Sequence, residues 1–258
     1  MTRLMINLNA DLGESFGAWH MGDDPALLQV INSANIACGF HAGDPTIMRQ
    51  TVRLAKKNGV SIGAHPSFPD LQGFGRRLIH MSTSDLEATI LYQVGALQAM
   101  AAAEGTRVTH VKPHGALNNL ACADAAVAAT VVRALQSVEP KLILLAPAHS
   151  ELVKAAQAAE LPVRHEIFAD RAYLDDGQLM PRSQAGAVLH DPQQCVEHVM
   201  KMLKAQAIVT ASGHHLPTRI DSICLHGDGP QATASARLIR QKLMDENYDL
   251  IPLDRLPN

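Results

Sequence analysis

The sequence has no long hydrophobic run, few aromatic residues and no excess of basic side chains. No apolar segment approaches the roughly 18 residues that a membrane span needs, and the first expected strand starts too early to leave room for a signal peptide. Lys and Arg number 22 against 25 Asp and Glu, and the net charge is −3. No basic patch is therefore available for nucleic acid. These absences predict a cytoplasmic protein with no membrane and no nucleic acid as partner.

The cysteines and the common catalytic signatures are equally uninformative about a standard scaffold. Cys38, Cys122, Cys195 and Cys224 are widely separated and form no C-x-x-C pair, which favours a reduced compartment over a disulfide framework. G-x-x-x-x-G-K-[ST], G-x-G-x-x-G, H-E-x-x-H and G-x-S-x-G are all absent. A P-loop NTPase, a Rossmann dehydrogenase and a serine hydrolase are therefore disfavoured.

What the sequence does contain is a regular alternation of strand and helix patterns. The expected strands are Arg3–Asn9, the first part of Ser33–Pro45, Val60–His65, Val108–Pro113, Leu142–Pro147, Val163–Phe168 and Ser222–His226. The expected helices are Asp24–Asn32, one from Pro45 to just before Gly59, Ser84–Glu104, Asp124–Gln136, His149–Ala159, Pro192–Ala205 and Gln231–Asn247. Irregular segments are expected at Pro66–Arg77, Ala169–Arg182 and Thr210–Asp221. Strict alternation of this kind predicts a parallel sheet.

The positions of the polar residues favour a closed barrel over an open doubly wound sheet. Polar side chains end nearly every expected strand, so the active groups must gather from all round the sheet. The C-terminal rim of a barrel collects such groups at one place, whereas an open sheet offers only a crevice. No linker interrupts the 258 residues, of which 47% are hydrophobic. We predict a single α/β domain over residues 1–258, a TIM-like (β/α) barrel with seven strands.

One face of five expected strands is polar where a barrel built only for stability would carry Val, Ile and Leu. The residues on this face are Asn7, Asn9, Asp11, Asn35, His41, Ser61, His65, His110, Lys112, His114, Cys224 and His226. Burying an unpaired polar group costs about 1–3 kcal/mol, so a dozen such groups indicate chemistry. A single histidine at a strand end is most simply a structural residue, but four at corresponding ends favour a catalytic role.

Several of these residues have two plausible roles. Asp11, with Glu14 close behind it, could be a general base or a metal ligand, or could simply cap a turn. Lys112 could hold a substrate carboxylate or phosphate, or act with a lowered pKa. The alternative for Lys112 is an internal ion pair with Asp11 or Glu166. Glu166 itself could be a second acid or base.

Two glycine-containing segments could bind anions. Arg76 and Arg77 lie in a loop with Gly73 and Gly75, which suits an anion-binding lid, although exposed surface arginines have the same pattern. The segment 227–230, Gly-Asp-Gly-Pro, resembles a phosphate-binding turn at a helix start but is also an ordinary turn.

The residues alone predict a barrel enzyme that hydrolyses a small anionic substrate by acid–base or metal-assisted chemistry. The predicted catalytic residues are Asp11, His41, His65, Lys112, His114, Glu166 and His226. The predicted substrate-binding residues are Asn7, Asn9, Asn35, Arg76 and Arg77. No residue is assigned to a cofactor or a metal.

Six segments, in order along nearly the whole chain, carry a family resemblance. They are Asn9–Glu14 (NADLGE), Asn35–Pro45 (NIACGFHAGDP), Gly63–Arg77, Val111–Leu117 (VKPHGAL), Glu166–Arg171 and the tripeptide at 226–228 (HGD). Together they resemble the LamB/YcsF family. The family commonly has an aromatic residue after the Leu of the fourth segment, where this chain has Asn118.

The resemblance implies a barrel related to polysaccharide deacetylases and a role as one subunit of a 5-oxoprolinase. Such an enzyme opens the lactam of 5-oxoproline (pyroglutamate) to glutamate by ATP-dependent hydrolysis, with ADP and phosphate as the other products. The resemblance thus implies ATP as co-substrate and two partner subunits, B and C. Phosphorylation of the lactam oxygen would activate the ring carbon for attack by water, with Asp11 or a histidine as base. Lys112 and the arginines could offset the negative charge.

Two other functions stay open at this point. The chain could be a metal-dependent deacetylase or amidohydrolase acting on a small amide or sugar, with Asp11 and strand-end histidines holding a divalent cation. It could also be a non-catalytic subunit that captures 5-oxoproline for its partners. A homo-oligomer is compatible with each of these functions.

Overall fold

Seven parallel strands close into a barrel in the computed structural model, which describes residues 4–227, 229 and 231–257. The barrel strands are β1 (Leu4–Leu12), β2 (Ser33–Ala37), β3 (Ser61–His65), β4 (Val108–Val111), β5 (Ile143–Pro147), β6 (Val163–Phe168) and β9 (Ser222–His226). Closure comes from β1, which pairs in parallel with β2 and with β9. The predicted seven-stranded α/β barrel is confirmed.

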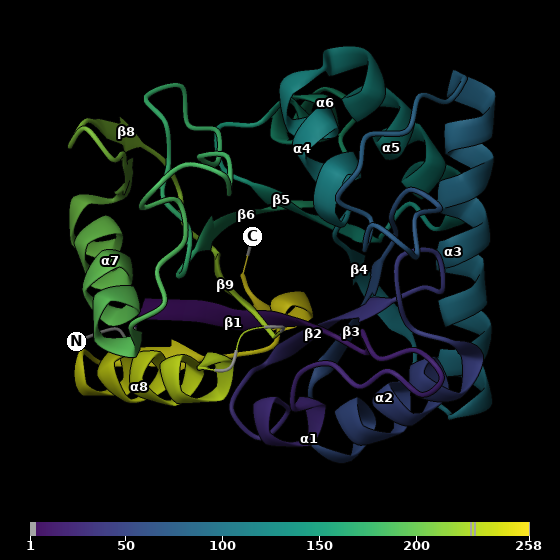
Figure 1. Cartoon of the computed structure of the whole chain (residues 1–258), viewed down its shortest axis with the longest axis horizontal. Helices are drawn as coiled ribbons and strands as arrows, with labels where there is room; N and C mark the ends of the chain where they lie inside the picture. Colours follow the sequence, from purple (N-terminus) through teal and green to yellow (C-terminus); the bar gives the residue numbers. More distant parts are fainter. Residues whose placement is uncertain (1–3, 228, 230, 258) are drawn as a thin grey trace.

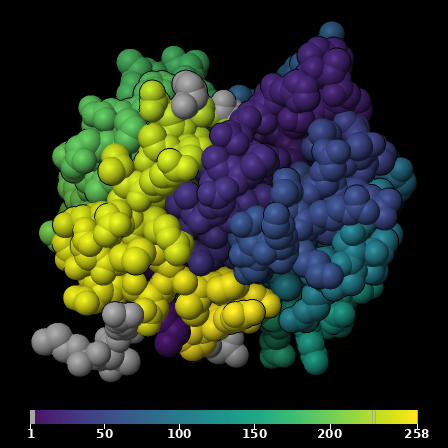
Figure 2. Space-filling view, turned by 90° about the horizontal axis from the view of Figure 1, so that it is seen from below, coloured from purple at the N-terminus to yellow at the C-terminus, as the bar shows by residue number. Residues whose placement is uncertain are grey.

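The helices lie outside the strands (Figure 1). They are α1 (Asp24–Leu27), α2 (Pro45–Lys57), α3 (Thr83–Ala103), α4 (Gly115–Ala123), α5 (Ala125–Val138), α6 (Glu151–Ala158), α7 (Pro192–Ala205) and α8 (Ala232–Asp245). Figure 2 shows α8 in yellow and α2 in blue on either side of the purple N-terminal residues. Apolar strand residues such as Ile6, Leu8 and Ala10 are fully buried in the main hydrophobic core.

The ends of the helices follow the capping residues that the sequence supplies. Asp44 accepts hydrogen bonds from the amides of Thr46 and Ile47 at the start of α2, with Pro45 in the first turn. Asp124 caps α5 in the same way. Among the described residues no single helix is long and apolar enough to cross a membrane, and only the pair α4 and α5, bent by 116°, passes by length and composition.

The structure corrects several expected boundaries. The helix expected over Asp24–Asn32 is only the single turn α1, because the chain leaves it so that the Asn32 amide can bond to the Leu8 carbonyl beside β1. Strand β2 ends at Ala37, and the four residues that follow form a turn instead of extending the strand to His41. The first expected strand runs on to Leu12, and its expected first residue, Arg3, lies outside the described residues.

Further elements are present that the sequence patterns did not predict. They are α4, the short antiparallel strands β7 (Ala207–Val209) and β8 (His215–Pro217), strand β10 (Tyr248–Leu250) and the 3₁₀ turn η1 (Leu253–Arg255). Helix α4 escaped notice because its nine residues are followed at once by α5 at a sharp bend. The three-residue strands are too short to give a periodic pattern. The four cysteines are free and buried, as expected.

The C-terminal residues close the N-terminal end of the barrel. Strand β10 pairs with the first residues of β1, and the amide of Leu253 donates to Ser33 Oγ at the start of β2. Leu253 and Leu256 pack on Leu145 of β5. The Arg164 guanidinium donates to the carbonyls of Leu256 and Pro257, at 2.7 and 2.9 Å. With this end filled, a ligand must enter from the C-terminal end of the strands.

A glycine in β3 makes room for the polar interior. A Cβ at Gly63 would lie 2.2 Å from His110 Nε2, and the strand register shifts at this point between β3 and β4. The His110 ring uses the space to reach Asn35 Oδ1 at 3.1 Å. The conformation of Gly63 is ordinary, so it is the absent side chain that matters here.

We expect Gly63→Ala to lower the free energy of unfolding by about 1–3 kcal/mol, because the added methyl must displace the His110 ring. Gly95→Ala is the matched control, since Gly95 is exposed in α3 and a Cβ there would meet nothing within 4 Å. This control should raise the free energy of unfolding by up to about 1 kcal/mol. Urea unfolding measures both variants. Equal effects of the two substitutions would show that the interior at His110 is not tightly packed.

Candidate active site and cation site

A cavity of about 540 Å³ lies at the C-terminal end of the barrel. Its volume falls within the roughly 300–1,000 Å³ typical of small-molecule sites. Five of the seven predicted catalytic residues line it, namely Asp11, His65, Lys112, His114 and His226. The other two lie directly behind them, since Glu166 contacts Lys112 and the His41 ring stacks on His114 at 3.7 Å. The structure therefore brings all seven together.

The Lys112 ammonium lies inside the barrel between two carboxylates. Nζ is 3.0 Å from Asp11 Oδ1 and 3.4 Å from Glu166 Oε1, and it also contacts Cys224 Sγ at 2.8 Å. Burial alone lowers the pKa of Lys112, but these neighbours raise it well above its ordinary value. Lys112 is thus a permanent cation, and the internal ion pair with both acids is correct.

The two acids beside Lys112 respond in opposite directions. Burial raises the pKa of Asp11, but the charges of His65 and Lys112 outweigh it and hold that pKa well below its usual range. Burial raises the pKa of Glu166, and Lys112 offsets this only in part. Glu166 Oε2 has no hydrogen-bond partner among the described residues. Asp11 is therefore the carboxylate that stays ionised at the cavity wall.

The predicted substrate-binding asparagines form the support beneath this ion group. Asn9 Nδ2 donates to Glu166 Oε1 at 2.9 Å, and Asn35 Nδ2 donates to Asp11 Oδ1 at 2.9 Å. Asn7 Nδ2 donates to Ser33 Oγ nearer the closed end. All three asparagines are fully buried, and none is among the described residues that line the cavity. They position the acids through the barrel interior.

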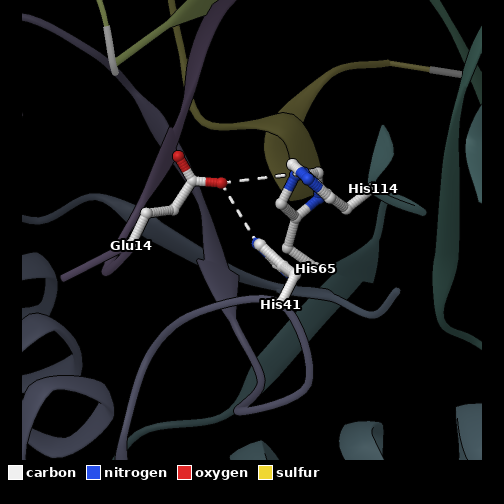
Figure 3. Close-up of side chains that lie close together, drawn as sticks. All are labelled: Glu14, His41, His65 and His114. Carbon is white, nitrogen blue, oxygen red and sulfur yellow. Dashed lines mark hydrogen bonds and ion pairs between the residues drawn. The ribbon is translucent and has the colours of Figure 1, made fainter. Parts of the chain in front are cut away.

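Three histidines and one glutamate converge above Asp11 (Figure 3). One ligand atom from each of Glu14, His41, His65 and His114 lies within 4.8 Å of the others, and all four side chains are buried. Glu14 Oε1 is 3.1 Å from His41 Nε2 and 3.6 Å from His114 Nδ1. A set of nitrogen and carboxylate ligands of this kind suits a divalent transition metal.

Backbone carbonyls determine which ring nitrogens carry hydrogen. His65 Nδ1 must donate to the Lys112 carbonyl at 2.6 Å, and His114 Nε2 must donate to the Phe74 carbonyl at 2.8 Å, because a carbonyl oxygen only accepts. The remaining nitrogens, His65 Nε2 and His114 Nδ1, lie 2.9 Å apart, and His65 Nε2 is 3.3 Å from Asp11 Oδ2.

This arrangement leaves lone pairs and carboxylates facing one another. Burial, followed by the neighbouring His41 and His65, lowers the pKa of His114 well below its ordinary value. Burial and then His65 do the same to the pKa of His41, whose Nδ1 has no partner among the described residues. These two rings are neutral at pH 7. The space between the four ligands is therefore chemically suited to a cation, as in metal sites whose histidines are oriented by carbonyl groups.

Asp170 is a functional residue that the sequence patterns missed. His226 Nδ1 lies 2.8 Å from Asp170 Oδ2, and the His226 ring stacks on Phe168. Burial lowers the pKa of His226, but Asp170 outweighs it and raises the pKa above the ordinary value of 6.5. Asp170 lies within the Glu166–Arg171 segment of the family resemblance, which was the one available signal. The pair offers a protonated imidazole at the cavity wall.

The two arginines predicted for anion binding have different positions. Arg76 lines the cavity, and its guanidinium lies 4.9 Å from the Phe74 ring. Arg77 instead pairs with Asp70, which fastens the loop, and it is not among the described residues that line the cavity. A Cβ at Gly75, whose φ is +64°, would lie 2.7 Å from the His114 ring, so this loop packs directly on the cation site.

Two features of the cavity stand apart from the predictions. Asp228 and Pro230 of the possible phosphate-binding turn lie outside the described residues. Arg171 and Arg182, which come from the loop after β6, line the cavity together with Asn118 and Gln178. Sequence reasoning missed these four side chains because irregular loops carry no periodic signal.

The comparisons with known proteins agree with this architecture. The model of the LamB/YcsF family matches residues 6–258. A protein of Azoarcus sp. (strain BH72), named as the A subunit of 5-oxoprolinase, is 57% identical over 253 residues, which cover 98% of this chain and 99% of that protein.

Solved structures give the same result for the fold. A lactam utilization protein from Thermus thermophilus is 40% identical, with a TM-score of 0.90 over 96% of this chain and 99% of that chain. The catalytic domain of a peptidoglycan N-acetylglucosamine deacetylase from Eubacterium rectale ATCC 33656 shares the fold alone. Its TM-score is 0.53 at 11% identity, over 97% of this chain and 89% of that domain. By sequence and by structure, the chain belongs to the LamB/YcsF family.

Proposed function

We propose that this chain is the A subunit of an ATP-dependent 5-oxoprolinase and that lactam hydrolysis takes place in the barrel cavity. The observation that carries the proposal is the convergence on one cavity of Asp11, the His226–Asp170 pair and the cation site. Similarity to proteins named as the A subunit of 5-oxoprolinase supports the substrate. Those names describe one subunit of several, which supports partners that we take to be subunits B and C. A reduced cytoplasmic setting suits the four free thiols.

The cavity residues divide the hydrolysis between a base and an acid. Asp11 is held ionised by Lys112 and can accept the proton of an attacking water. His226 carries a proton because Asp170 raises its pKa, and can donate it to the ring nitrogen as the C–N bond breaks. ATP supplies the driving force by phosphorylating the lactam oxygen. One water opens the ring to an acyl phosphate, and a second water releases phosphate and glutamate.

A divalent cation fits the site made by Glu14, His41, His65 and His114. The orphaned His41 Nδ1 and the facing lone pairs of His65 and His114 support this assignment. When bound, the cation would polarise a carbonyl or lower the pKa of a water. The same cation site also favours a second candidate function, a metal-dependent amidohydrolase or deacetylase that needs no ATP.

We expect the purified chain alone to form little glutamate from 5-oxoproline, and the chain with subunits B and C and ATP to form it steadily. A coupled glutamate assay with and without ATP measures both. Fast amide hydrolysis by the isolated chain without ATP would instead establish the second candidate.

In the reconstituted complex we expect Asp11→Asn to lower kcat by at least about 100-fold, because Asn cannot accept the proton. Binding of 5-oxoproline, measured by calorimetry, should change little, since the side-chain shape is kept. A loss of binding that matches the loss of turnover would point to a subunit that only captures the substrate.

We expect the purified chain to retain about one equivalent of a divalent metal ion by elemental analysis, and His114→Ala to lose it. The reason is that His114 Nδ1 is one of four converging ligands. His80→Ala is the matched control, since His80 is exposed and lies outside the cluster. Equal metal content in the two variants would refute the cation site.

The pH dependence of turnover should follow the His226–Asp170 pair. An acid whose pKa is raised stays protonated to higher pH, so activity should fall on the alkaline side as pH passes above the raised pKa of His226. Asp170→Asn removes the stabilising charge and should move this alkaline limb to lower pH. Asp245→Asn, an exposed change on α8, should leave the profile in place. An unshifted limb in Asp170→Asn would exclude His226 as the acid.

A further inference from the structure

Three arginines that the hydrolysis does not use line the same cavity. Arg76 comes from the loop after β3, and Arg171 and Arg182 come from the loop after β6. Two loops separated by about a hundred residues in sequence thus place guanidinium groups around one space. Like charges repel one another, so their convergence on one cavity indicates an anionic ligand.

Backbone contacts hold the central arginine of this group in place. Arg171 is only 5% exposed, and its guanidinium donates to the carbonyls of Ala187 and Met180, at 3.3 and 2.7 Å. Burial, and then the charge of Arg182, lower its pKa to about 10, with Arg76 contributing in the same direction. The three guanidinium groups are therefore near enough to repel one another across the cavity.

The other charged groups of the cavity lie in close ion pairs. Lys112 is balanced by Asp11 and Glu166, and His226 by Asp170. Among the described residues that line the cavity, Asp11 is the one carboxylate. Cationic side chains thus outnumber carboxylates around this space, and a single substrate carboxylate would offset the difference only in part. A phosphoryl group carries more charge and more acceptor oxygens, and guanidinium groups match its geometry.

We propose that Arg76, Arg171 and Arg182 form a phosphoryl-binding site, which receives the phosphate group of the nucleotide or of the phosphorylated substrate. The proposal rests on the proposed function, since it states where the phosphate of that reaction is held. Phe74 links this site to the histidines, because its ring lies under Arg76 and its carbonyl accepts from His114. Phosphate bound by the arginines would therefore lie in the same cavity as Asp11 and His226.

Calorimetric titration of the full-length chain with inorganic phosphate, ADP and 5-oxoproline, at constant ionic strength, tests the proposal. We expect Arg76→Gln and Arg182→Gln each to weaken phosphate and ADP binding by about tenfold, because each removes one charge-assisted contact. Both side chains are exposed enough for the variants to fold. Arg107→Gln is the matched control, because its side chain is 80% exposed and precedes β4 at the closed end of the barrel.

Binding of 5-oxoproline should stay within about twofold in all three variants. A loss confined to 5-oxoproline would assign the arginines to the substrate carboxylate and overturn the proposal. Unchanged phosphate and ADP binding in both variants, or no phosphate and ADP binding by the unaltered chain, would also overturn it. These titrations need no turnover, so a failure of the glutamate assay and a failure of the phosphoryl site are separate results.

Discussion

A buried ammonium is the constraint on which the rest of this barrel depends. Lys112 is 2% exposed in the interior of a closed sheet, where an uncompensated charge would be very costly. Asp11 and Glu166 compensate it from neighbouring parts of the barrel wall. Their own remaining oxygens then require donors, which Asn9 and Asn35 provide. The polar interior is thus a connected network in place of the aliphatic layers usual in such barrels.

The ion group also sets the chemistry of the cavity above it. Asp11 faces Lys112 with one oxygen and His65 with the other, so a single carboxylate joins the interior network to the cation site. The backbone carbonyls of Lys112 and Phe74 then orient the rings of His65 and His114. Because these contacts exist before any ligand binds, the site is held in place by the fold itself. This preorganisation suits the hydrolysis of a stable amide.

The two ends of the barrel have different tasks. The C-terminal residues fill the N-terminal end, where Leu253 and Leu256 pack on Leu145 and Arg164 holds the last carbonyls. The opposite end is left to loops, which supply Asp170 and the three arginines. Stability is thus built at one end and function at the other, as is general for β/α barrels.

The sequence by itself determined the barrel, its seven strands and the seven residues that meet at the cavity. It could do so because strand residues alternate between two faces, and polar side chains of one parity must share the inside. Alternation cannot tell how deep along the barrel a residue lies, so Asn7, Asn9 and Asn35 were expected at the substrate although they lie beneath the acids. Only the tertiary structure placed Asp170, Arg171 and Arg182, because irregular loops follow no period and their course depends on what they pack against.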